Sequence, residues 1–520
     1  MVAFFMMELV KKHIHTNRRS AGVISQVTLD EDFNVPDTLD DVEHIILCNG
    51  ELEIESAKNL GERAAVRGKL KFCLLYRTPS GKLRTLAGGI PFDENINMPG
   101  LSENDYMQTE WEVDDLNIGI INSRKLNVKS LVTFRLQAET IYDAEAGVDV
   151  RFDGEVEFLK RSVPTSVLSV RRKDTFRVRD TFSVSANKPD VDTILWQDLR
   201  LRGVNTKPLD GKIHIDGELM VFLIYTGGSG DIPVQCIEEA IPFSGDVELA
   251  ESLEEMIPFI AVRLLHKDVE ISPDADGEMR ELSVDAVIEL EIRLYEEEEL
   301  ELLSDLYALD RELVLESDET YFDQIAARNL LKNRIQEKVE LPLGQRVLQI
   351  CHCGGDVRLD EVRMEEGAMS VDGVLEVQLL YLTTDDAAPV STSVEMLPFH
   401  VTAQMPGITE KSMYRAEPYL EQISAVMLGG EGVEIKAVVA VDTLLMNRVR
   451  EQVILDLKEE PLDMEKLKQL PGIVGYVVQP GDSLWKIARK FHTSVDEIMT
   501  ANGKTDSTVH AGDKLVLVKK

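Results

Sequence analysis

The sequence repeats one pattern three times, and this repetition strongly limits what the chain can fold into. Each copy has a glycine, an apolar segment that ends in a tyrosine eight positions later, and then an apolar residue followed by Pro-Phe. The copies occupy residues 68–76 with 90–92, 217–225 with 241–243, and 373–381 with 397–399. The glycines lie 149 and 156 positions apart, so the repeated unit is a whole domain and not one turn of a solenoid.

The repeats have the pattern of β-strands. In the second copy, apolar residues alternate with polar ones over 282–294, and similar segments close the other copies at 131–136 and 433–441. Alternation with a period of two is typical of a strand with one buried face. We therefore predict three mainly β domains with antiparallel strands, at 1–160, 161–316 and 317–455. Short helices are predicted at 323–332 and 410–416, the second of them ended by Pro418.

Two features of the repeats have structural and functional explanations. Tyr76, Tyr225 and Tyr381 at matching places are either a repeated ligand site or, more commonly for such tyrosines, packing residues. The Pro-Phe elements fit an edge strand or the start of a strand, where the missing N–H of proline does no harm. A charged segment with prolines follows at 456–474, and its composition predicts a solvated linker.

The last 46 residues, 475–520, have a different pattern. An apolar run enters a turn at Pro480-Gly481, after which Asp482 or Ser483 can cap a helix. Apolar residues then recur at helical spacing, at Leu484, Ile487, Ala488 and Phe491. A second helix starts at a capping-box pattern, 494–497, and ends at Asn502-Gly503, before a closing strand at 515–518. The predicted order is strand, helix, helix, strand, which is a small α+β module.

This order resembles a LysM module, on the strength of Tyr476, the turn at 481–484, Ile487-Ala488, Asn502 and Gly512-Asp513. LysM modules bind N-acetylglucosamine polymers such as peptidoglycan, in a shallow groove made by two loops, and some dock on proteins instead. By position, the resemblance implies loops at 481–484 and 502–509. The binding surface that we expect comprises Gly481, Asp482, Ser483, Leu484, Trp485, Ile487 and Asn502.

Trp485 has two explanations. It lies about 100° around the helix from Leu484, at the margin of the apolar face. It either covers the core of the module or forms an exposed aromatic anchor, the type of residue that often dominates an interface. Both remain open from the sequence.

Charge excludes one class of partner. The formal net charge of −37 argues against nucleic-acid binding, because nothing offsets repulsion by a polyanion. The tail differs from the rest, with seven Lys and Arg against five Asp and Glu between residues 475 and 520. An acidic surface on a partner would therefore be attracted to this end of the chain.

The cysteines and the apolar segments limit the remaining possibilities. Five scattered cysteines predict no disulfide framework and fit a reducing compartment. Cys351-His352-Cys353 has no second pair downstream, so we predict neither a metal site nor a cofactor. The apolar run at 1–10 has no basic residues before it and no small-residue cleavage site after it, so we expect no secretory signal. We also expect no transmembrane segment.

No motif indicates an enzyme. The sequence has no Gly-x-Ser-x-Gly elbow, no phosphate-binding glycine loop and no His-Glu-x-x-His. A glycosidase needs two placed acids in a cleft, and three similar β repeats leave no separate catalytic domain for them. We therefore expect a protein that performs no chemistry.

The repeated Gly-x-Leu-x-x-x-Leu-x-Tyr strand and the Pro-Phe element behind it resemble the SPOCS repeat of spore-forming Firmicutes. Three such repeats and a LysM module are similar to the SipL-type (SpoVID-like) spore-coat morphogenetic proteins. The resemblance implies an adaptor in the mother-cell cytoplasm at the forespore surface. It would dock through its LysM module to the ATPase of the coat's basement layer, and to other coat proteins. The alternative is a peptidoglycan-binding protein of the cortex or cell wall.

Overall fold

The computed structural model describes residues 7–152, 154–227, 234–341, 347–384, 390–428, 432–461 and 472–518. It divides the chain before residue 461 into three units of six strands. The first has β1 (Glu8–Asn34), β2 (His44–Asn59), β3 (Arg63–Arg77), β4 (Leu83–Asn97), β5 (Tyr106–Asn122) and β6 (Lys125–Arg151). The second has β7 (Val156–Ser183), β8 (Val191–Leu209), β9 (Lys212–Gly227), β10 (Gln235–Glu248), β11 (Ile257–Pro273) and β12 (Met279–Ala308). The third has β13 (Glu312–Glu340), β14 (Val347–Glu365), β15 (Ala368–Thr383), β16 (Val390–Gln404), β17 (Met413–Met427) and β18 (Gly432–Glu460).

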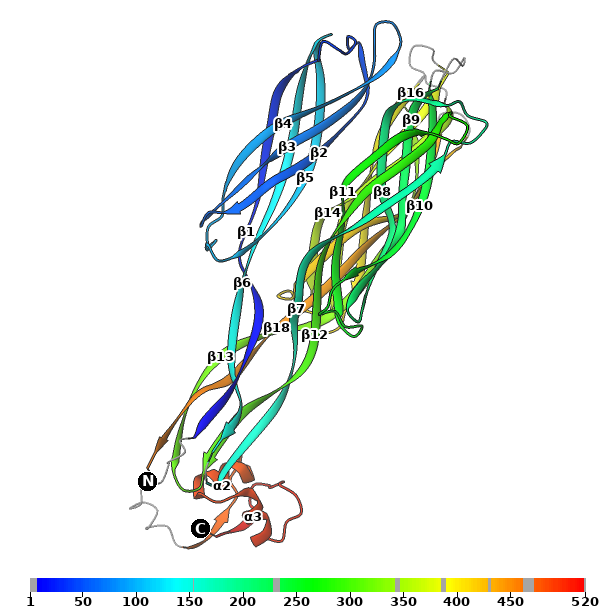
Figure 1. Ribbon diagram of the computed structural model, residues 1–520. Coiled ribbons are helices and arrows are strands. Elements are labelled where there is room, and N and C mark those ends of the chain that lie inside the picture. The colour runs from blue at the N-terminus through cyan, green and yellow to red at the C-terminus, as the bar shows by residue number, and fades with distance from the viewer. Residues whose placement is uncertain are drawn as a thin grey trace.

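Each unit is a sandwich of two three-stranded antiparallel sheets. In the first unit the sheets have the strand orders β2-β3-β4 and β1-β6-β5, and the other two units repeat this topology. The inward faces of the two sheets supply one continuous apolar core per unit. The prediction of a mainly β chain with antiparallel strands is confirmed, and Figure 1 shows the first sandwich beside the other two, which overlap in this view.

The repeated glycine and phenylalanine are partners across two strands. Gly68 pairs with Phe92, and the other copies pair in the same way. A Cβ on Gly68 would lie 2.2 Å from the carbonyl oxygen of Glu53 and 3.0 Å from the ring of Phe92. The glycine is therefore needed because a ring crosses over it while the neighbouring strand approaches closely. The Pro-Phe elements lie on β4, β10 and β16, which are edge strands as predicted.

The repeated tyrosines are core residues. Tyr76, Tyr225 and Tyr381 have no exposed surface. The hydroxyl of Tyr76 donates to the carbonyl oxygen of Asp40 at 3.0 Å, and that of Tyr225 donates to the carbonyl oxygen of Pro189 at 3.2 Å. Each hydroxyl thus ties the end of a core strand to the segment that leads into the sheet, which fits packing and not a ligand site.

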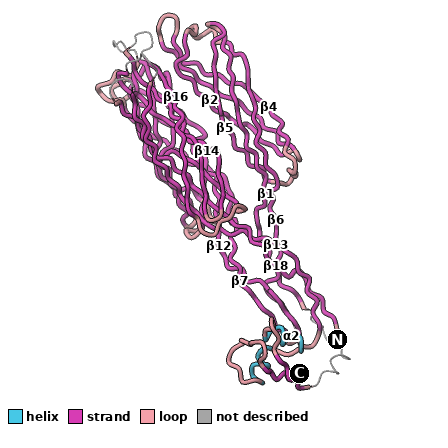
Figure 2. Tube along the Cα trace, turned by 180° about the vertical axis from the view of Figure 1, so that it is seen from behind, coloured by secondary structure: helices cyan, strands magenta, loops and turns pink. Residues whose placement is uncertain are grey.

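Three pairs of long strands extend beyond the sandwiches and form a stalk (Figures 1 and 2). They are β1 with β6, β7 with β12, and β13 with β18, each strand being 27 to 30 residues long. One face of every pair is apolar, and these faces pack together around Ile14, Ala144, Ala146, Val163, Leu300, Leu302, Phe322 and Val453. The stalk is therefore a packed element shared by all three units.

Both predicted helices are wrong. Residues 323–332 lie within β13, and residues 413–416 lie within β17. Almost every residue of β13 pairs with β18, so a ladder of backbone hydrogen bonds along the stalk overrides the local helical preference of this segment. Pro418 lies in β17, an edge strand, where proline costs no ladder bond.

The predicted linker is also shorter than 456–474. β18 continues to Glu460 because its last residues pair with the start of β13 at the end of the stalk. Residues 462–471 lie outside the described residues. The domain limits at 160, 316 and 455 stay a prediction.

Candidate functional site

The last described segment, 472–518, folds as the predicted small α+β module. It comprises β19 (Ile473–Val477), α2 (Leu484–Phe491), α3 (Val495–Ala501) and β20 (Lys514–Val518), with β19 and β20 paired antiparallel. Its core contains Val478, Leu484, Ile487, Ala488, Ile498, Leu515 and Leu517. The module lies at the far end of the stalk from the three sandwiches (Figures 1 and 2).

The turn before α2 is held by local hydrogen bonds. The Asp482 carboxylate accepts from the Tyr476 hydroxyl at 2.7 Å and from the Gln479 N–H at 2.9 Å. Both hydrogen bonds lower the pKa of Asp482, and the bond from Tyr476 has the larger effect. Ser483 caps α2, since its hydroxyl accepts from the backbone N–H of Lys486 at 3.3 Å. Gly481 has a φ of +88°, a conformation that favours glycine.

Three of the residues predicted to bind are structural in this module. Leu484 and Ile487 are 0% and 1% exposed, so they hold α2 against the core and do not reach the surface. The side-chain amide of Asn502 donates to the carbonyl oxygens of Ile498 and Val516, at 2.7 and 2.8 Å, and accepts from the Val516 N–H at 2.7 Å. It therefore fastens the end of α3 to β20. The exposed parts of the two predicted loops are Gly481, Ser483, Gly503 and residues 505–508.

Trp485 contacts the stalk. Its indole N–H donates to the carboxylate of Asp305, near the end of β12, at 2.8 Å. Its ring meets that of Tyr307 edge-on, with centroids 4.9 Å apart and planes at 68°. Arg489, one turn along α2, donates to both oxygens of Asp305 at 2.8 and 2.9 Å. The sequence analysis missed Asp305 and Tyr307, because nothing local marks a contact across 180 positions.

Tyr307 lies at the centre of this contact. Only 4% of its surface is exposed, and its hydroxyl donates to the carbonyl oxygen of Thr493 at 2.9 Å. Burial, together with the nearby carboxylates of Glu157 and Asp305, raises the pKa of the Tyr307 hydroxyl. The ring is part of the apolar cluster that forms the core of the module. The stalk therefore contributes a residue to the packing of the module.

A cavity of about 2530 Å³ lies between the three sandwiches. Each of the six sheets contributes one edge strand to its lining, namely β2, β5, β8, β11, β14 and β17, and residues of neighbouring strands complete it. All six strands carry β-bulges, as do the edge strands β1, β7 and β13, whereas the edge strands β4, β10 and β16 carry none. Bulges twist an edge away from further pairing, so these edges do not invite an added strand.

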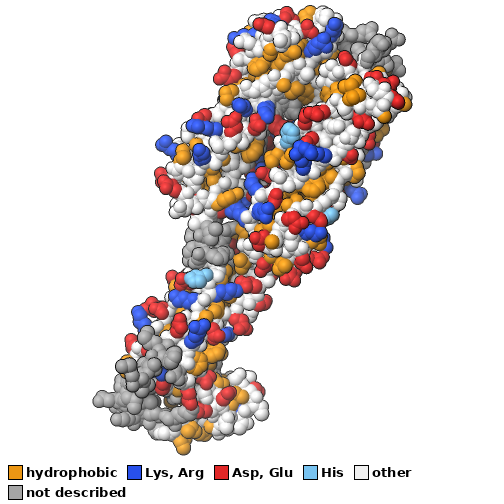
Figure 3. All heavy atoms as spheres, viewed as in Figure 1, with side chains coloured by type: hydrophobic (Ala, Val, Ile, Leu, Met, Phe, Trp, Pro, Cys, Tyr) orange, Lys and Arg blue, Asp and Glu red, His pale blue; other side chains and the backbone are white. Residues whose placement is uncertain are grey.

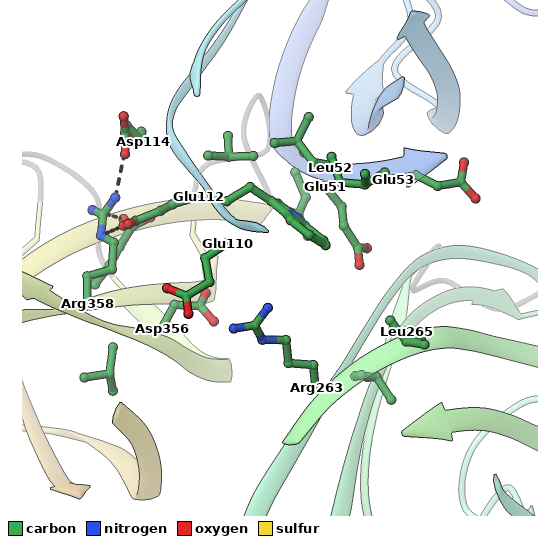
Figure 4. A pocket seen from close by; sticks show the side chains of 18 of the residues that line it. Glu51, Leu52, Glu53, Glu110, Glu112, Asp114, Arg263, Leu265, Asp356 and Arg358 are labelled. Carbon is green, nitrogen blue, oxygen red and sulfur yellow. Dashed lines mark hydrogen bonds and ion pairs between the residues drawn. The ribbon is translucent and has the colours of Figure 1, made fainter. Parts of the chain in front are cut away.

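Ion pairs between units line this cavity. Figure 4 shows Arg358 of the third unit beside Glu112 and Asp114 of the first. Its Nε lies 3.3 Å from the Glu112 carboxylate, and Nη1 donates to the carbonyl oxygen of Asp114 at 3.4 Å. Arg263 lies 3.7 Å from Glu417, which is 29% exposed. The pKa of Glu417 is raised to about 7, mainly by burial. The nearby carboxylates of Glu110, Glu291 and Asp442 also raise this pKa, whereas the positive charge of Arg263 lowers it.

Where the sandwiches meet the stalk, a buried carboxylate joins all three units. Glu139 of the first unit accepts from Arg171 and Arg293 of the second, at 2.8 and 3.3 Å, and from Arg415 of the third at 2.5 Å. Burial would raise the pKa of Glu139, but the three guanidinium groups outweigh it and lower the value to about 2. The Glu139 carboxylate therefore links the three units through ion pairs.

Cys351-His352-Cys353 lies at the contact between the second and third units. The ring of His352 stacks on Phe222, with centroids 4.1 Å apart, and its Nε2 lies 3.2 Å from a carboxylate oxygen of Asp198. Within the described parts of the chain, no group of three or more His, Cys, Asp or Glu side chains is placed to hold a metal ion. The motif serves packing between units.

Acidic and basic side chains are scattered over the whole face seen in Figure 3. The described part of the chain thus combines three β-sandwiches, a shared stalk and a small α+β module. Of the helices in the described segments, none is both long and apolar enough to span a membrane.

Comparison with protein families agrees with this architecture. The model of the SipL, SPOCS domain matches residues 41–121, 190–272 and 346–428, and that of the LysM domain matches residues 476–518. The chain therefore belongs to the proteins that combine three SipL SPOCS domains with a C-terminal LysM domain. These are binding and scaffold domains, and the chain is a LysM-containing, coat-associated sporulation protein. No match was found among curated proteins.

Each SPOCS match covers the four strands between the two long ones of a unit, β2–β5 in the first. The six long strands that build the stalk lie entirely outside the matches. The stalk is thus a feature that the structure adds to the family description.

Proposed function

We propose that this protein is a non-enzymatic adaptor of spore coat assembly. Its LysM domain docks on the ATPase of the coat's basement layer, at the forespore surface in the mother-cell cytoplasm, while the SPOCS units engage other coat proteins. The observation that carries this proposal is the placement of the LysM domain at the tip of a stalk formed by all three units. A module so placed can reach a partner that the bulky sandwiches do not contact.

The docking surface of the LysM domain centres on the start of α2. Gly481 and Ser483 are exposed there, and the half-buried Trp485 follows. Asp482, Leu484, Ile487 and Asn502 support this surface from below, through the hydrogen bonds and the core contacts described above. The basic residues of α2 lie on the same module, which suits a partner with an acidic surface.

The test is capture of the purified basement-layer ATPase by the full-length protein. Trp485→Ala should weaken capture, because truncating an aromatic anchor typically costs about 2 kcal/mol or more, roughly thirtyfold in Kd. Thr500→Ala is the control, since Thr500 is exposed on α3, outside the proposed docking surface, and its replacement is expected to leave capture close to wild type. Circular dichroism would verify that both variants fold. Capture by Trp485→Ala at wild-type strength would refute the proposal.

A second candidate function is binding of peptidoglycan. It is favoured by the exposure of Gly481, Ser483 and residues 505–508, which belong to the two loops that form the glycan groove in LysM modules. Sedimentation of the full-length protein with purified peptidoglycan separates the two functions. A protein-docking module should remain in the supernatant, whereas a glycan-binding one should appear in the pellet.

A further inference from the structure

The side of the LysM domain that faces the stalk has the composition of a recognition surface. Trp485 and Arg489 are four positions apart on α2 and therefore project from the same face. Together they hold the Asp305 carboxylate through three hydrogen bonds, and Trp485 also packs on the ring of Tyr307. Tryptophan and arginine are the residue types most often found at the energetic centre of protein interfaces.

The chemistry of the occupant is specific. A carboxylate satisfies the indole N–H and the guanidinium at the same time, and hydrogen bonds between charged groups are stronger than those between neutral ones. The neighbouring aromatic ring fills the space beside Trp485 and donates its hydroxyl to the carbonyl oxygen of Thr493. The stalk tip thus presents an acidic and an aromatic side chain two positions apart on one strand.

Tyr307 is buried in this contact, but the ionic part of the contact is weak. Arg489 and Asp305 are 45% and 24% exposed, and ion pairs with this much solvent contribute little to stability. Glu157 of β7 is subject to the negative charges of Asp496 and Glu497 of α3. Burial is the largest cause that raises the pKa of Glu157. The carboxylates of Asp496, Glu497 and Glu155 raise this pKa further. Like charges therefore oppose the docked arrangement.

We infer that the Trp485–Arg489 face recognises a carboxylate flanked by an aromatic ring, and that the stalk tip occupies this face until the docking partner displaces it with a similar pair. The identity of the partner rests on the proposed function above. The stalk tip is then an internal competitor, and its removal strengthens docking, because affinity is no longer reduced by the fraction of occupied molecules.

The first measurement needs no partner. Asp305→Arg in the full-length protein places a positive charge against Arg489 and should release α2. Hydrogen exchange of residues 484–491 should become about tenfold faster, while residues 433–441 of β18 exchange as in the wild type. Glu301→Arg is the matched control, because it reverses an exposed charge on the same strand and should leave exchange in α2 unchanged. Unchanged exchange in Asp305→Arg would overturn the internal contact.

The second measurement compares capture of the basement-layer ATPase by the same proteins. Asp305→Arg should bind about tenfold more tightly than the wild type and the Glu301→Arg control, and Trp485→Ala should bind more weakly. If Asp305→Arg releases α2 but binds no more tightly, competition is wrong while the proposed docking through Trp485 stands. If Trp485→Ala binds normally, the proposed docking fails and competition fails with it, whereas the exchange result still tests the internal contact.

Discussion

Trp485 donates its indole N–H to a carboxylate oxygen of Asp305, 180 positions earlier in the chain, over 2.8 Å. The bond joins the LysM domain to the end of β12, in the second unit, although the LysM domain follows the third unit in the sequence. A terminal domain is thereby held by a unit that is not its neighbour in the chain. The orientation of the module depends on the stalk as well as on the residues that precede it.

The repeated glycines should differ in their tolerance of alanine. A Cβ would lie 2.2 Å from a backbone oxygen at Gly68 and 2.3 Å at Gly373, but no closer than 3.0 Å to any atom at Gly217. Overpacking of this kind costs about 1–3 kcal/mol. We expect Gly68→Ala and Gly373→Ala to lower the urea midpoint of unfolding clearly more than Gly217→Ala does. Equal midpoints for the three variants would contradict this explanation of the repeat.

Removal of the charge at Glu139 should loosen the assembly of units. Glu139→Gln leaves Arg171, Arg293 and Arg415 close together without their shared carboxylate, and breaking a buried ion pair on one side costs about 3–5 kcal/mol. Denaturant unfolding at pH 7 measures the loss. Glu112→Gln, which removes a carboxylate from the more open inter-unit cavity, is the control and should cost less. Similar losses in the two variants would argue against a special role of Glu139.

Glu417 should make stability depend on pH. Its pKa is about 7 in the folded protein against an ordinary value of 4.5, so between these values the folded state binds more protons than the unfolded state. Stability therefore falls as pH rises through this range, and the loss persists above it. Glu417→Gln should be more stable than the wild type at pH 8 and similar to it at pH 4.5. If the melting temperatures of the two proteins changed with pH by the same amount across this range, Glu417 would not be the cause of the pH dependence.

Asn502 should act on the stability of the LysM domain. Asn502→Ala removes two hydrogen bonds to Val516 of β20 and one to Ile498 of α3, and a typical hydrogen bond contributes about 0.5–1.5 kcal/mol to stability. Faster hydrogen exchange in residues 514–518 would report the loosening of β20, while residues 282–294 of the second unit should not change. Thr508→Ala, in the exposed loop nearby, serves as the control. Loss of binding by Asn502→Ala without faster exchange would instead indicate direct contact with a ligand.

Local sequence patterns were sufficient to predict much of the structure of this protein. The capping box at 494–497, the cap at Ser483 and the apolar spacing of α2 are interactions within one or two turns, so the sequence predicts the LysM fold and its core. The same holds for the alternation of apolar and polar residues in β12.

The amino-acid sequence by itself determined the three β units, their repeated glycine, tyrosine and Pro-Phe positions, and the LysM domain, because these follow from periodicity and from neighbours close in the chain. Only the tertiary structure decided that residues 323–332 are strand, that Glu139 binds three arginines, and that Trp485 rests on Asp305 and Tyr307. The physical reason is the same in each case. These residues are placed by partners roughly 30 to 280 positions away, and such contacts leave no pattern in the residues on either side.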